Sequence, residues 1–113
     1  MLFDLEAYAI KRAGFPLAVC AKAELSNSCY EARIADKFPG GDVEYSADPA
    51  VAQVIIEVVR YDRLCFQSVV PWAEAVMIWN AERYDAVDLI LRFTRENEEG
   101  VEEETLRVPI ERI

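Results

Sequence analysis

The stretch Leu17–Leu25, LAVCAKAEL, alternates regularly between two kinds of position. Every second residue from Leu17 to Leu25 is apolar, whereas Lys22 and Glu24 lie between them. Successive side chains of a β-strand point to opposite faces, so this pattern predicts a strand with one buried face and one solvent-facing face.

The same alternation recurs along the chain. It is present in CYEARIADKF (residues 29–38), AVDLILRF (86–93) and VEEETLRVPI (101–110), and turn-forming stretches such as PGGD and RENEEG separate such segments. About six or seven short segments divided by turn signals are typical of antiparallel β architectures. We therefore expect a mainly β fold, a small antiparallel β-sandwich or open barrel with room for one or two short helices, formed by a single domain of residues 1–113.

Three segments fit a helix or a strand. In residues 48–60, Asp48 and Pro49 would open a helix, but the many β-branched residues favour a strand, followed by a turn at 60–63 and another strand over 64–70. In residues 71–83, Ala, Glu and Met favour a helix with proline in its first turn, while the apolar spacing also fits a strand. Residues 4–14 fit a short helix ending at Gly14 or a first strand.

The connection at residues 26–29 is open as well. A hairpin there would place Glu24 opposite Glu31 and Lys22 opposite Arg33, and directly opposed like charges destabilise a sheet. It would also separate Cys20 and Cys29 by roughly 20 Å at strand rise, beyond disulfide reach. A connection that crosses between two sheets is the alternative, and it leaves the distances between cysteines undetermined.

Charge and composition exclude several classes of partner. The chain has 12 basic and 21 acidic residues and a net charge of −9, so it repels phosphate backbones and anionic membranes. Asp4 and Glu6 interrupt the N-terminal apolar residues where a secretory signal would be continuous, and no apolar run approaches the roughly 18 residues of a membrane span. These features predict a soluble, cytoplasmic protein that binds neither nucleic acid nor membrane.

The residues for common catalytic chemistry are missing. The sequence has no histidine, no glycine-rich phosphate loop and no nucleophile elbow, and the acidic run 96–104 reads as a solvated hairpin rather than a calcium loop. We therefore expect no metal, no cofactor and, on balance, no enzyme. The three cysteines leave at least one thiol unpaired, which suits a reducing compartment, and Cys29 is a candidate reactive thiol if Arg33 lies close to it.

Aromatic residues are concentrated in one third of the chain. We expect Trp72 to continue a core face, whereas Trp79 fits a core or a surface equally well. With Ile55, Val59 and Tyr61 beside Trp79, a strand sheet would have a second apolar face that needs a cover. The candidate interface residues are Trp79, Trp72, Tyr61, Val59 and Ile55.

These patterns predict a binding or interaction module that self-associates, or binds a protein partner, through an apolar strand face. One alternative is a small-molecule-binding protein or unorthodox enzyme with an aromatic-lined pocket. Another is an acidic inhibitor or decoy that occupies a basic protein. The sequence does not identify the ligand, the partner or the biological process.

Overall fold

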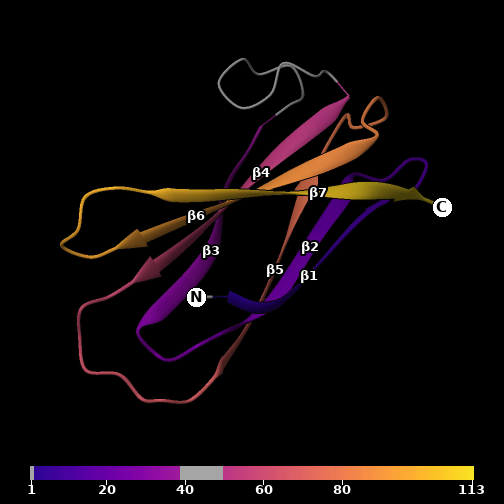
Figure 1. Cartoon of the computed structure of the whole chain (residues 1–113). Helices are drawn as coiled ribbons and strands as arrows, with labels where there is room; N and C mark the ends of the chain where they lie inside the picture. Colours follow the sequence, from indigo (N-terminus) through magenta and orange to yellow (C-terminus); the bar gives the residue numbers. More distant parts are fainter. Residues whose placement is uncertain (1, 39–49) are drawn as a thin grey trace.

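The computed structural model describes residues 2–38 and 50–113, and this part of the chain contains seven strands and no helix. The strands are β1 (Leu2–Lys11), β2 (Leu17–Leu25), β3 (Tyr30–Phe38), β4 (Val51–Arg60), β5 (Val70–Ile78), β6 (Ala86–Arg95) and β7 (Glu102–Arg112). They form a single sheet in the order β3-β4-β6-β7-β1-β2-β5 that curls into a nearly closed barrel (Figure 1). The prediction of a mainly β fold is confirmed, and the sheet takes the open-barrel alternative rather than the sandwich.

Most neighbouring strands of the sheet are antiparallel. The exceptions are β1 with β7 and β4 with β6, which run parallel. At the two sheet edges, the backbone N–H of Ile34 on β3 donates a hydrogen bond of 2.6 Å to Glu74 Oε2 on β5. A side-chain carboxylate thus bridges the place where a closed barrel would have a backbone ladder.

The barrel interior collects the alternating apolar residues. On β2 all five predicted core residues, Leu17, Val19, Ala21, Ala23 and Leu25, are buried. The interior face of β4 supplies Ala52, Val54, Ile56 and Val58, and that of β6 supplies Val87, Leu89 and Leu91. The alternation therefore identified the buried face of these strands correctly.

The ambiguous segments are strands. The preferred strand in 48–60 is confirmed as β4 from Val51, and residues 48 and 49 lie outside the described part. The helix alternative for 71–83 is wrong, because β5 pairs with β2 over its whole length, from Leu17 opposite Ile78 to Leu25 opposite Val70. Nine paired residues outweigh the helix propensity of Ala, Glu and Met. Residues 2–11 also form a strand, and Gly14, with φ 83°, lies in the following turn.

The hairpin alternative for the open connection at residues 26–29 is wrong, since β2 pairs with β1 and β5 while β3 pairs with β4. The chain crosses to the far edge of the same sheet, which avoids opposing Glu24 with Glu31. The strand predicted over 64–70 is also wrong: β5 begins only at Val70, and residues 61–69 form a loop.

Strand direction places the loops at two ends of the barrel. Because β4 and β5 run in opposite directions, the 61–69 loop leaves the end of β4 and enters the start of β5 at one end. The connections 26–29 and 96–101 lie at the same end, and the connections 12–16 and 79–85 at the other (Figure 1).

Candidate interaction surfaces

The predicted interface residues are not gathered in one place. Ile55 is only 2% exposed on β4, and Val59 and Tyr61 are partly buried at the end of that strand. Trp79 follows β5 at the opposite end of the barrel and is 68% exposed. The structure therefore does not form the expected surface of Ile55, Val59 and Tyr61 beside Trp79.

The two tryptophans differ in environment. Trp72 is partly buried and packs against the barrel core, as expected. Its buried Nε1 has no hydrogen-bond partner among the described residues. Trp79 lies at the surface. The sequence had not decided between a core and a surface position for this residue.

An uncharged outer surface does exist, but on other strands. Cross-strand pairing aligns Ile10, Ala18 and Met77 in one row and Tyr8, Cys20 and Ala75 in the next, across β1, β2 and β5. We call these six residues the apolar face. Met77 is 47% exposed, Tyr8 and Ala75 are also exposed, and Ile10, Ala18 and Cys20 are half-buried. Part of this surface therefore faces solvent.

The sequence contains a pattern that indicates this apolar face. On β5 the outward positions Pro71, Ala73, Ala75 and Met77 are all apolar, in alternation with the inward ones. A strand that is apolar on both faces must meet a second layer or be left exposed. Sequence reasoning missed the matching outward positions on β1 and β2 because it did not know that these strands neighbour β5.

An ion pair borders the apolar face. Glu6 and Lys22 occupy the next row, with Lys22 Nζ 3.0 Å from Glu6 Oε2, and Ala73 completes that row. The hydrogen bond and the positive charge of Lys22 lower the pKa of Glu6, and the same contact with Glu6 raises the pKa of Lys22. This border is therefore charged but locally neutral, whereas on the β7 side Ile10 lies beside the exposed Glu111.

The outer face of β3, β4, β6 and β7 has the opposite character, and we call it the charged face. One row runs Arg33, Glu57, Arg92, Glu103 across the four strands. Arg33 Nη2 lies 2.9 Å from Glu57 Oε2, and Arg92 Nε lies 3.1 Å from Glu103 Oε1. The hydrogen bond to Glu57 raises the pKa of Arg33. Opposite charges alternate across this row, which is the favourable cross-strand arrangement.

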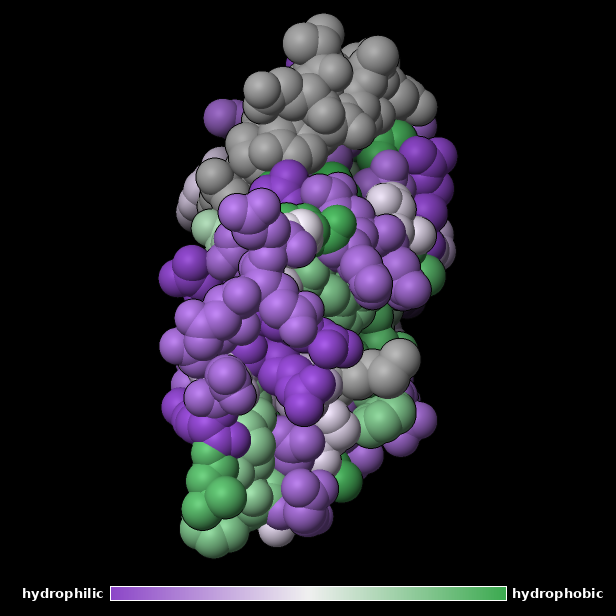
Figure 2. Space-filling view, turned by 60° about the vertical axis from the view of Figure 1, so that its left-hand side comes forward, coloured by the Kyte–Doolittle hydropathy of each residue, from purple (hydrophilic) through white to green (hydrophobic). Residues whose placement is uncertain are grey.

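The 61–69 loop is a second exposed apolar region. Leu64 is 101% exposed, Phe66 is 80% exposed, and Val69 is exposed as well. Figure 2 shows hydrophobic residues gathered at the lower end of the molecule, where Figure 1 places this loop. The loop therefore displays large apolar side chains to solvent instead of burying them.

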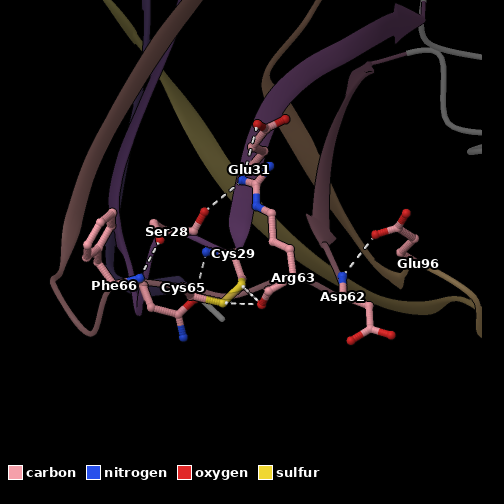
Figure 3. Close-up of polar contacts among 9 residues, drawn as sticks. Ser28, Cys29, Glu31, Asp62, Arg63, Cys65, Phe66 and Glu96 are labelled. Atoms are coloured by element: carbon pink, nitrogen blue, oxygen red, sulfur yellow. Dashed lines mark hydrogen bonds and ion pairs between the residues drawn. A yellow bond between two sulfur atoms is a disulfide. The ribbon is translucent and has the colours of Figure 1, made fainter.

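Covalent and polar contacts fasten this loop. Cys65 forms a disulfide with Cys29, with a Cα–Cα distance of 5.3 Å, within the usual range for a disulfide. Phe66 N donates to Ser28 Oγ at 2.8 Å, and Ser28 N donates to the Phe66 carbonyl at 3.3 Å. Figure 3 shows these contacts beside the disulfide.

Charged residues hold the start of the loop. Arg63 Nη2 donates to the Ser28 carbonyl at 2.8 Å and lies 3.8 Å from Glu31 Oε1. Asp62 N donates to Glu96 Oε2 at 2.9 Å, which links the loop to the β6–β7 connection (Figure 3). The acidic run thus supplies a structural contact, and the described residues contain no cluster of acidic or sulfur ligands suited to a metal ion.

The cysteines differ from one another. Cys20 is a free thiol, as the odd number requires, whereas the Cys29 sulfur is bonded to Cys65. Arg33, the expected activating charge for Cys29, instead pairs with Glu57. The reactivity of Cys29 stays a prediction for the reduced form.

A hollow formed by residues of β1, β2 and β5 bears on the small-molecule alternative. It has a volume of about 510 Å³ and is lined by Asp4, Glu6, Lys22, Ala23, Glu24, Pro71, Trp72 and Ala73. It contains one aromatic residue and four charged ones, rather than the aromatic lining expected.

Among the described residues there is no helix long and apolar enough to cross a membrane.

No protein-family model, curated protein or solved structure matches the chain. The function must therefore be inferred from the surfaces themselves.

Proposed function

We propose that the chain is an interaction module that self-associates through the apolar face, with a second copy of the chain as the partner. The observation that carries this proposal is the pair of uncharged rows, Ile10–Ala18–Met77 and Tyr8–Cys20–Ala75, on the outside of the sheet. Exposed contiguous apolar surface of this kind is typical of interaction sites.

Charge favours this face as the contact between copies. Two chains of net charge −9 repel each other, so they can approach closely only where acidic side chains are absent or paired. The two rows contain no charged residue, and Glu6 at one border is paired with Lys22. Glu111 on β7, beside Ile10, is the acidic residue next to these rows on the other border.

Shape also favours a two-fold arrangement. Along β5 the outward residue is large at one end, Met77, and the outward residues are small further along, Ala75 and Ala73. An isologous dimer places each patch against its own inverted copy. Met77 of one copy would then pack over the small residues of the other, with the sheets about 10 Å apart.

Sedimentation velocity over a concentration series tests this proposal. We expect the wild-type mass to rise from one chain to two, and Ala75→Glu to weaken the dimer by at least about tenfold because it brings two carboxylates into an apolar contact. Thr105→Glu is the matched control, since Thr105 is an exposed residue of β7 in the row of Ile90, on the charged face.

Two outcomes would contradict self-association through this face. One is a wild-type protein that stays monomeric at every concentration. The other is equal dissociation constants for Ala75→Glu and Thr105→Glu, with circular dichroism showing that both variants are folded. The small-molecule and acidic-inhibitor hypotheses, and the cytoplasmic location, stay predictions.

A further inference from the structure

Cys29 and Cys65 connect two loops that are distant in sequence. Their separation is 36 residues, and the disulfide ties the β2–β3 connection to the 61–69 loop. Cys29 is only 1% exposed, whereas Cys65 is partly exposed. A soluble thiol can therefore approach the bond from the Cys65 side.

The surroundings of the two sulfurs fit the reduced form as well as the disulfide. The carbonyl oxygen of Arg63 lies 3.1 Å from Cys29 Sγ and 3.0 Å from Cys65 Sγ (Figure 3). A disulfide sulfur has no proton to donate, but a thiol can donate its S–H to this oxygen. Reduction thus exchanges a covalent bond for weak hydrogen bonds to an acceptor that is already in place.

The other contacts of the loop are weaker than the disulfide. Phe66 and Ser28 exchange two hydrogen bonds, Arg63 donates one to the Ser28 carbonyl, and Asp62 donates one to Glu96. Phe66, Arg63 and Asp62 are exposed. Exposed backbone hydrogen bonds with few buried apolar contacts open with low free energy. Loss of the covalent link should therefore lower the free energy of local opening first in residues 62–66.

We propose that Cys29 and Cys65 form a redox-controlled clasp that fixes the 61–69 loop, with Leu64 and Phe66 displayed, when oxidised and loosens it when reduced. The reductant is a dithiol. One of its thiolates attacks Cys65 Sγ, the S–S bond breaks, and Cys29 leaves as a thiolate that takes up a proton. The second thiol of the reductant then displaces Cys65, so that two electrons and two protons pass to the protein and the reductant ends as a disulfide.

The redox state of the clasp would change how much conformational entropy the 61–69 loop loses when it makes a contact. Leu64 and Phe66 are held ready for a partner when the loop is fixed, and ordering a loose loop on binding costs free energy. This inference does not depend on self-association, because the apolar face contains neither cysteine of the clasp.

Amide hydrogen exchange on the full chain, with and without dithiothreitol, tests the clasp. We expect the Ser28 and Phe66 amides to exchange about tenfold faster after reduction, with no change at Val54 or Leu89 in the core, and recovery after reoxidation. The Cys29→Ser variant should resemble the reduced protein without reductant, and Cys20→Ser should respond as wild type.

Intact mass after alkylation gives the second readout. The oxidised protein should take up one alkyl group and the reduced protein three, because Cys20 is free in both. The clasp is overturned if three thiols remain alkylatable after treatment with an oxidised dithiol. It is equally overturned if the loop amides exchange at the same rate in both redox forms.

Discussion

The charged face and the apolar face belong to one sheet and share one core, yet they differ in what they can contact. Across β3, β4, β6 and β7 one outer row alternates Arg33, Glu57, Arg92 and Glu103, and the charges of this row are paired with one another. Across β1, β2 and β5 the two rows of the apolar face are uncharged. Inward alternation specifies the fold, whereas the outward residues decide which part of the sheet can receive a partner.

Burial separates the two faces further. Ile55 and its cross-strand partner Ile90 are buried although they lie outward among the strands of the charged face. Met77 lies outward on β5 and remains exposed. An apolar residue in an outward position is therefore a candidate contact only where the structure leaves it uncovered.

The largest expected effect contrasts these two residues. Ile55→Ala should lower the free energy of unfolding by about 2–5 kcal/mol, because it removes buried methyl groups. Met77→Ala should change it by less than about 0.5 kcal/mol, as for other exposed positions. Urea denaturation at low protein concentration, where self-association does not contribute, gives both values. Equal losses in the free energy of unfolding would show that Ile55 and Met77 are buried to the same extent.

An intermediate effect concerns the seam between β3 and β5. Glu74→Ala should destabilise the protein by about 1–3 kcal/mol, because it leaves the Ile34 N–H without its acceptor. Glu74→Gln keeps a side-chain carbonyl oxygen and should lose less. Thermal unfolding of both variants tests this. If alanine and glutamine were equivalent, the hydrogen bond would not hold the sheet edges together.

The smallest effect is expected at the border of the apolar face. Lys22→Gln should move the pKa of Glu6 back up towards its ordinary value, because the hydrogen bond and charge of Lys22 lower it. The lowered pKa means that Glu6 contributes stability above its unfolded pKa and loses it as the pH falls through the folded pKa. The stability difference between wild type and variant should therefore shrink on acidification. A carboxyl-carbon NMR titration of Glu6 measures the shift, and an unchanged pKa would rule out the pair in solution.

Sequence reasoning reached the buried face of the sheet but only part of the surface. The alternation in Leu17–Leu25 and in 86–93 predicted strands correctly, because period-two patterning is local. It also predicted the buried side chains of Leu17–Leu25, but in 86–93 Asp88 and Ile90, on the opposite face, are buried as well. It failed for 64–70, where Leu64 and Phe66 look like one face of a strand but lie in a loop. It also placed Ile55 and Trp79 on one surface, since nothing local shows that β4 and β5 run in opposite directions.

The sequence by itself determined the mainly β character, the inward residues of the clearly alternating segments, the acidic charge and the odd thiol, because each follows from composition or from neighbouring residues. The tertiary structure alone decided the strand order, the β2–β5 pairing that forms the apolar face, and the approach of Cys29 to Cys65 over 36 residues. These features depend on contacts between distant segments. Local propensity carries no information about which distant segments meet, so they emerge only when the sheet assembles.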